Sequence, residues 1–171
     1  MIGALHEPEA VMKSLITITG SRYDATVNSC YAILKRCGWT PDVVEVFHPQ
    51  QAPFPEHARK AAEALSVILE DYHGHRGYKV NLHPFEETDL VSYSTAIEGI
   101  IKENFNQRIE TAVDITCGRK VVSGVLLKTA SVHRNKILHI FCVYVKAKAY
   151  FDRWYPLRPA NSQDVMDLMT F

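Results

Sequence analysis

Short apolar segments rich in β-branched residues alternate along this chain with segments whose apolar residues recur at helical spacing. The expected strands cover residues 14–20, 42–48, 78–85, 111–116 and 137–145. The expected helices cover residues 24–37, 57–72, 92–105 and 120–130. Parallel strands joined by short helical connections require right-handed crossovers, which place helices on both faces of the sheet. The alternation therefore predicts an α/β fold of the Rossmann-like, doubly wound type with a mostly parallel sheet.

The length of the chain fits one domain. It has 171 residues, 47% of them hydrophobic, which is ample for one core. We expect the core to span about residues 13–145. Residues 146–171 contain several aromatic residues and fit no single periodic element, so we expect a C-terminal extension that serves as an edge strand, a dimer arm or a lid.

Charge and cysteine content exclude several classes of function. Nineteen basic residues balance nineteen acidic ones, so no overall field attracts long nucleic acid or an anionic membrane. The four cysteines show no CxxC pair and no zinc-site spacing, which favours reduced thiols. The N-terminal residues lack the pattern of a signal peptide, and no apolar run approaches about 18 residues. These features predict a cytoplasmic protein that does not span a membrane.

The segment VDITCGRKVVS at residues 113–123 carries the strongest sign of a ligand site. A buried strand ends there on a turn that opens directly into a helix, and in doubly wound sheets ligands bind outside the carboxyl ends of the strands. Helix-start N–H groups, with Thr116, Ser123, Arg119 and Lys120, suit a phosphate. Alternatively, Gly118 only permits a tight turn and the two cations are solvated.

The loop after the first strand, TGSRYD at residues 19–24, is the second candidate. It offers hydroxyls, a glycine, an arginine and an aromatic ring that can stack on a base. Ser21 or Asp24 could also cap the following helix. Neither loop matches the GxxxxGK[ST] pattern, and no GxGxxG follows the first strand, which disfavours nucleoside triphosphates and dinucleotide cofactors.

Residues 114–120, DITCGRK, resemble the signature Asp-x-Thr-Gly-Gly-Thr-Lys of CRISPR-associated Rossmann-fold (CARF) domains, the sensors of type III CRISPR antiviral defence. Asp114, Thr116, Gly118 and Lys120 match the signature position by position. Cys117 stands where the family commonly has glycine, and Arg119 where it commonly has threonine. The predicted order of strands and helices supports the resemblance, which implies one CARF-like domain over residues 1–171.

The resemblance implies a homodimer that binds a cyclic oligoadenylate, most often the tetramer, on its two-fold axis. A stand-alone domain of this kind resembles the ring nucleases, which cut the ring and switch the response off. The chemistry needs no metal or cofactor, because a ribose 2′-hydroxyl can attack the adjacent phosphate and leave a 2′,3′-cyclic phosphate. The family pattern assigns catalysis to Ser21 and Lys120, assisted by Arg22 or Arg119. The expected ligand-binding residues are Thr19, Gly20, Arg22, Tyr23, Asp24, Thr116, Cys117, Gly118, Arg119 and Ser123.

Other polar residues near the strand ends have ordinary structural interpretations. His48 and His83 end two strands, where a histidine is more often hydrogen-bonded than catalytic. Asp114 is expected to hold its loop by accepting N–H bonds. Acidic residues that follow the third strand could bind a metal, although a solvated loop is favoured; they are Glu86, Glu87 and Asp89.

Two further functions remain open beside a ring nuclease. One is a non-catalytic module that senses or sequesters the same ring. The other is an unrelated Rossmann-like nucleotide-binding protein. An R-x4-H pattern from Arg134 to His139 superficially fits HEPN ribonucleases, but no helical bundle is predicted around it.

Overall fold

The computed structural model describes residues 11–74 and 77–170, and its centre is a six-stranded sheet of order β3-β2-β1-β4-β5-β6. The strands are β1 (Lys13–Ile18), β2 (Val43–Pro49), β3 (Lys79–Phe85), β4 (Glu110–Asp114), β5 (His139–Val145) and β6 (Gln163–Asp167). The helices are α1 (Tyr23–Cys37), α2 (Phe54–His73), α3 (Leu90–Asn106) and α4 (Lys120–Val132). Strands β1 to β5 pair in parallel and β6 is antiparallel, which confirms the Rossmann-like α/β prediction.

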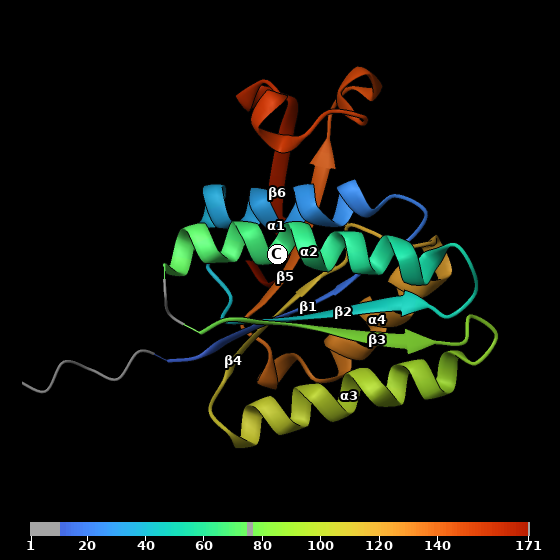
Figure 1. Ribbon diagram of the computed structural model, residues 1–171. Helices are drawn as coiled ribbons and strands as arrows, with labels where there is room; N and C mark the ends of the chain where they lie inside the picture. Colours follow the sequence, from blue (N-terminus) through green and yellow to red (C-terminus); the bar gives the residue numbers. More distant parts are fainter. Residues whose placement is uncertain (1–10, 75–76, 171) are drawn as a thin grey trace, which may run out of the picture.

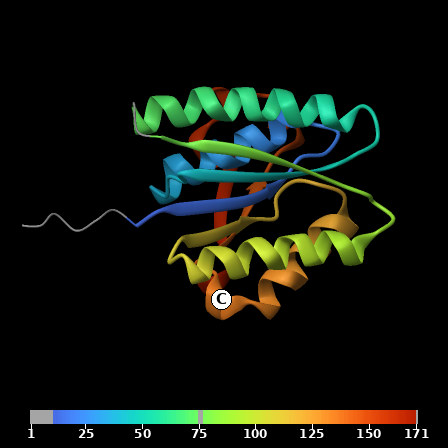
Figure 2. The same ribbon diagram turned by 60° about the horizontal axis from the view of Figure 1, so that its bottom comes forward.

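Helices cover both faces of the sheet. α1 and α2 lie over one face, and α3 and α4 lie over the other (Figures 1 and 2). The chain builds outward from β1 to β3 and then returns to add β4 beside β1, where Leu15 is paired with Ala112. The direction of winding therefore reverses between β1 and β4, and such a switch point is where doubly wound folds bind ligands.

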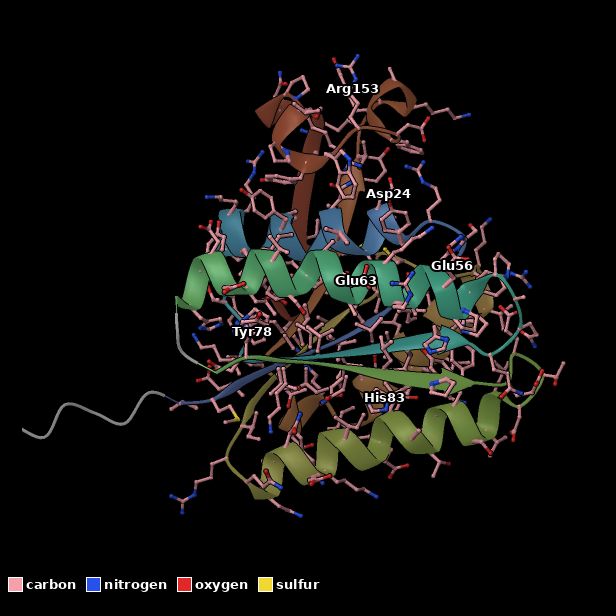
Figure 3. All side chains as sticks on the ribbon, viewed as in Figure 1. Asp24, Glu56, Glu63, Tyr78, His83 and Arg153 are labelled. Atoms are coloured by element: carbon pink, nitrogen blue, oxygen red, sulfur yellow. The ribbon has the colours of Figure 1, made fainter. Side chains whose placement is uncertain are left out.

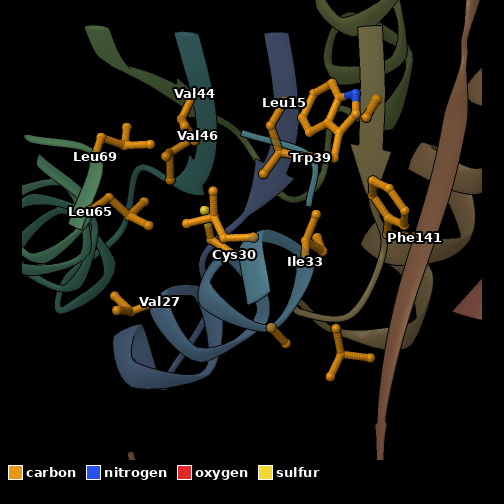
Figure 4. Close-up of a cluster of buried hydrophobic side chains, with 14 of the residues drawn as sticks. Leu15, Val27, Cys30, Ile33, Trp39, Val44, Val46, Leu65, Leu69 and Phe141 are labelled. Atoms are coloured by element: carbon orange, nitrogen blue, oxygen red, sulfur yellow. The ribbon is translucent and has the colours of Figure 1, made fainter. Parts of the chain in front are cut away.

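Two hydrophobic clusters hold the layers together, one on each face of the sheet. Neighbouring residues of β1 point to opposite faces, so Leu15 joins the α1 and α2 side while Ile16 joins the α3 and α4 side. Both side chains are fully buried. Figure 4 shows the first cluster, in which Cys30 and Ile33 of α1 lie near Leu15. The near-continuous apolar sequence of β1 thus reflects burial on both faces.

Residues 146–162 form short 3₁₀ turns that stand above α1 in Figure 1, and we call this segment the extension. The Tyr155 N–H donates to the Asn28 side chain at 2.6 Å, and the rings of Tyr31 and Tyr155 meet edge to face at 5.1 Å. The chain then enters β6, which pairs with β5 at the edge of the sheet. An edge strand was one of the three expected roles of the C-terminal residues.

The starts of α1 and α2 differ from the sequence predictions, and α3 begins at Leu90, two residues before its predicted start. α1 begins after Arg22, and no side chain caps it, so neither Ser21 nor Asp24 acts as the cap. The Asp24 carboxylate binds the Arg22 guanidinium instead. α2 begins at Phe54, three residues before the predicted start at His57, because Pro55 fits the first turn of a helix.

The sequence also predicted that the chain has no signal peptide and no membrane-spanning segment. The prediction that no signal peptide is present rests on residues 1–14, of which residues 1–10 lie outside the described residues. Within residues 11–74 and 77–170, no helix is long and apolar enough to cross a membrane.

Candidate functional site

The loops that follow β1 and β4 meet at the switch point of the sheet. A Cβ atom on Gly20 would lie 3.6 Å from the Gly118 Cα, so the two backbones are in contact. Gly118 has a φ of 95°, and a Cβ there would lie 3.2 Å from both Ile18 Cγ2 and Ser123 Oγ. Glycine at position 118 is therefore required by both backbone conformation and space.

A cavity of about 330 Å³ opens where these loops meet, and we call it the strand-end cavity. Its lining residues come from the two loops, from the start of α2 and from the end of β3: Ile18, Thr19, Gly20, Ser21, Arg22, Ala25, Pro49, Phe54, Phe85, Glu87, Thr116, Cys117, Gly118, Arg119 and Val122. The sequence predicted most of the polar residues in this set. Tyr23, Asp24, Lys120 and Ser123 are not among the lining residues.

Of the two cations at the start of α4, Arg119 has a carboxylate partner and Lys120 has none among the described residues. The Arg119 guanidinium donates to the Glu87 carboxylate at 2.9 Å and lies over the Phe54 ring at 5.8 Å. Lys120 is the first residue of α4 and is exposed. Its ammonium has no hydrogen bond or ion pair with any residue in the described part of the chain. Lys120 is therefore available to an anion from solvent.

Arg22 lies at the edge of the cavity between two carboxylates. Its Nε donates to Asp24 Oδ1 at 3.1 Å, and its terminal nitrogens contact Asp24, Asp152 and the Phe151 carbonyl. The hydrogen bond with Asp24 raises the pKa of Arg22, with burial opposing it. Figure 3 shows Asp24 at the start of α1, beneath the extension. A phosphate that binds Arg22 must compete with these carboxylates.

The buried Asp114 carboxylate organises the turn after β4. It accepts bonds from the Thr116 N–H at 3.0 Å, the Thr116 hydroxyl at 2.5 Å and the Thr17 hydroxyl at 3.1 Å. Burial raises the pKa of Asp114, and hydrogen bonds from Thr116, Ser29 and Thr17 oppose the shift. This geometry matches the expected structural role.

Apart from the exposed Ser21, the other hydroxyl and thiol groups of the two loops face inward. The Thr116 hydroxyl accepts from Ser29 Oγ at 3.0 Å and from the Val143 N–H at 2.8 Å. The Ser123 hydroxyl donates to the Cys117 carbonyl at 2.6 Å. Thr19 is fully buried, and its hydroxyl has no hydrogen-bond partner among the described residues. Burial also raises the pKa of the Cys117 thiol.

Tyr23 lies away from the cavity. Its ring packs against Trp154 of the extension at 6.2 Å and against His57 of α2 at 6.4 Å. His57 Nδ1 lies 3.3 Å from the Gly20 carbonyl, so this histidine supports the first loop. The sequence interpretation did not consider His57. Pro55 was the signal that could have located His57, because a proline in the first turn marks the start of α2, which follows the end of β2.

His48 and His83 have structural partners. His48 is buried, and its Nδ1 lies 2.9 Å from the Pro49 carbonyl. His83 Nε2 lies 2.5 Å from the Glu45 carboxylate, and its ring stacks on Phe47. Neither residue lines the strand-end cavity.

The acidic residues after β3 also have partners. Glu86 accepts from Gln51 at 2.8 Å, and Asp89 caps α3 by accepting from the Ser92 N–H at 3.0 Å. Residues 11–74 and 77–170 contain no group of three or more His, Cys, Asp and Glu side chains placed to hold a metal ion. Arg134 lies in a short 3₁₀ turn, and His139 is paired with Asp167 at 2.7 Å.

Comparisons with known proteins find a match by structure alone. No protein-family model and no curated protein sequence matches the chain. A solved structure, Enterococcus italicus Csm6 bound to cyclic hexa-2′-fluoro-hexa-dAMP, matches with a TM-score of 0.62 and 15% sequence identity. The match covers 94% of this chain but 42% of that one, so this chain spans less than half of the length of the matched chain. The chain thus shares its Rossmann-like fold, over nearly its whole length, with part of Csm6.

Proposed function

We propose that this chain is a ring nuclease that binds cyclic oligoadenylate across a homodimer and cleaves it, with cyclic tetra-adenylate as the expected ring. The observation that carries the proposal is the contact between the Gly20 and Gly118 loops. That contact brings Ser21, Arg22 and Arg119 to one cavity and leaves Lys120 exposed beside it. The fold shared with a protein solved with a cyclic adenylate analogue supports this class of ligand.

The size of the cavity favours a shared ligand. Its 330 Å³ lies at the lower end of the range for small-molecule sites, about 300–1,000 Å³, so it suits one nucleotide unit and not a whole ring. Two copies related by a two-fold axis would double every contact. Arg119 and Lys120 from both copies would then surround the phosphates.

The reaction uses the ligand's own nucleophile. The ribose 2′-oxygen attacks the adjacent phosphorus, and the 2′-O–P bond forms as the P–O5′ bond breaks. The proton of the 2′-hydroxyl is balanced by the proton gained at the 5′-oxygen, so the products are a 2′,3′-cyclic phosphate and a 5′-hydroxyl. Lys120 would stabilise charge on the phosphoryl oxygens, and the exposed Ser21 hydroxyl would align the ribose.

The deciding experiment incubates the protein with cyclic tetra-adenylate in EDTA and separates the products. We expect linear products that carry a 2′,3′-cyclic phosphate. A ring with 2′-deoxy or 2′-methoxy riboses should bind and stay intact. Retention of the natural ring without cleavage would indicate a sensing or sequestering module, and absence of binding would indicate an unrelated nucleotide-binding protein. Rapid cleavage of the 2′-deoxy ring would show that water attacks.

Lys120→Ala separates catalysis from binding. If Lys120 stabilises charge that develops in the transition state, the variant should cleave about 10²-fold more slowly and lose less in affinity. Lys128→Ala is the matched control, because Lys128 is also exposed on α4 but lies about two helical turns beyond Lys120 and lines a different pocket, between α3 and α4. Equal cleavage rates for Lys120→Ala and the wild type would remove Lys120 from the mechanism.

The proposed homodimer can be tested separately by light scattering with the ring present. We expect the mass of two chains at micromolar concentration. The mass of a single chain would contradict a site shared across a two-fold axis.

A further inference from the structure

A second pocket, of about 290 Å³, shares Arg22 with the strand-end cavity. Its walls are the end of β5, the start of α1 and the extension, and we call it the side pocket. The two hollows are neighbours, because both are lined by Arg22, Ala25 and Thr116.

Arg158 of the extension supplies a second cation to the side pocket. Its guanidinium is fixed by three neutral acceptors: the Arg153 carbonyl at 2.8 Å, the Gln163 side chain at 3.2 Å and the Phe151 carbonyl at 3.1 Å. No carboxylate among the described residues forms an ion pair with it. The charge is half-buried without a counter-ion in direct contact, a state that favours binding of an anion.

The direction of the pKa shift of Arg158 also indicates that negative charge around its guanidinium is insufficient. Burial lowers the pKa of Arg158, the nearby Arg22 acts in the same direction, and the field of Asp24 opposes both. Arg22 is itself shared between Asp24 and Asp152, and the Asp152 side chain is 88% exposed. A phosphate between the two guanidiniums would therefore meet the fixed cation of Arg158 and the cation of Arg22, where it has to displace only the exposed Asp152 while Asp24 stays in place.

Exposed aromatic rings stand beside these cations. Phe151 is 44% exposed and Tyr144 is 56% exposed, and both line the side pocket. Val143 adds a buried apolar surface below them. Aromatic faces next to guanidinium groups suit a nucleobase together with its phosphate.

We infer that the side pocket is a second nucleotide subsite, in which a base stacks on Phe151 and its phosphate lies between Arg158 and Arg22. The inference rests on the proposed function and deepens it. Because the two hollows share Arg22, they would hold neighbouring units of one ring. Two subsites in each of two copies match a ring of four nucleotides.

The test compares Arg158→Gln with Arg153→Gln, using cyclic tetra-adenylate as the probe. Arg153 belongs to the same extension, and its side chain lies at the tip, over the Tyr150 ring (Figure 3). Arg158→Gln should bind the ring about 10-fold or more weakly than the wild type, because the variant loses a charged hydrogen-bond donor to phosphate. Arg153→Gln should bind as the wild type does. Calorimetry gives both affinities, and thermal melting shows whether each variant is folded.

Phe151→Leu tests the stacking surface without removing a charge. Loss of one base–aromatic contact should weaken binding about 5-fold or more. This variant also keeps the inference testable if Arg158→Gln does not fold. Unchanged affinity in Phe151→Leu would overturn the stacking assignment.

A second probe, adenosine monophosphate followed by ligand-observed NMR, separates this inference from the proposed function. If the ring binds the wild type and Arg158→Gln equally, the subsite is wrong and the proposed function stands. If the monophosphate binds in a manner sensitive to Arg158 while the ring does not bind, the subsite is supported and the proposed function fails. Binding of neither probe to the wild type overturns both.

Discussion

Replacement of Gly118 by alanine should destabilise the fold, whereas the same replacement at Gly99 should stabilise it. A non-glycine residue at positive φ costs about 1–2 kcal/mol, and Gly118 has a φ of 95°. The new Cβ would also lie 3.2 Å from Ile18 Cγ2 and from Ser123 Oγ, and overpacking of this kind costs about 1–3 kcal/mol. Together these contributions give a loss of about 2–5 kcal/mol in the free energy of unfolding.

Gly99 provides the matched control because it lies inside α3, where a Cβ would meet nothing within 4 Å. Alanine there should add about 0.5–1 kcal/mol through helix propensity. Urea unfolding, followed by circular dichroism and by tryptophan fluorescence, measures both variants against the wild type. A midpoint for Gly118→Ala equal to or above that of the wild type would refute the argument that the turn after β4 requires glycine.

Two further predictions concern the carboxylates around the site. Asp152→Asn should tighten binding of cyclic tetra-adenylate about 2- to 5-fold in calorimetry, because loss of an exposed ion pair removes one of the two carboxylates that compete for Arg22, at little cost in stability. Asp164→Asn, which removes the exposed partner of Lys146, should leave the affinity unchanged, and weaker binding by Asp152→Asn would contradict the competition. Asp114→Asn should change how stability depends on pH. Since burial raises the folded pKa of Asp114, its contribution to stability is complete below the unfolded pKa of about 3.9 and is lost as the pH rises through the folded pKa. The urea midpoint of Asp114→Asn relative to that of the wild type should therefore rise as the pH increases from 4 to 7. If the two midpoints change in parallel with pH, ionisation of Asp114 does not contribute to the pH dependence of stability.

The sequence predicted the parallel part of the sheet because its signals are local. An apolar β-branched run such as residues 14–18 indicates a strand buried on both faces, and Gly38 correctly marked the end of α1 in a left-handed conformation. β6 was harder to place. Its five residues show no decisive pattern, and the strand is stabilised by pairing with β5.

The candidate site was predictable as far as it depends on the sheet. The rule that ligands bind at the carboxyl ends of strands brought the Gly20 and Gly118 loops together correctly. The partners of individual side chains were not predictable, because they are distant in sequence. Arg22 binds Asp152, 130 residues away, and Tyr23 turns to Trp154 of the extension instead of the cavity.

The two outer strands of the sheet limit how copies of this chain can associate. β3 contains Pro84, which has no N–H to donate, and begins with the exposed Lys79. β6 is short and carries Asp164 and Asp167. Edges with proline, charge and short length resist the addition of a further strand. A pair of chains is therefore expected to meet through helices and loops, with two separate sheets, and this arrangement leaves the carboxyl ends of the strands open to face a common ligand.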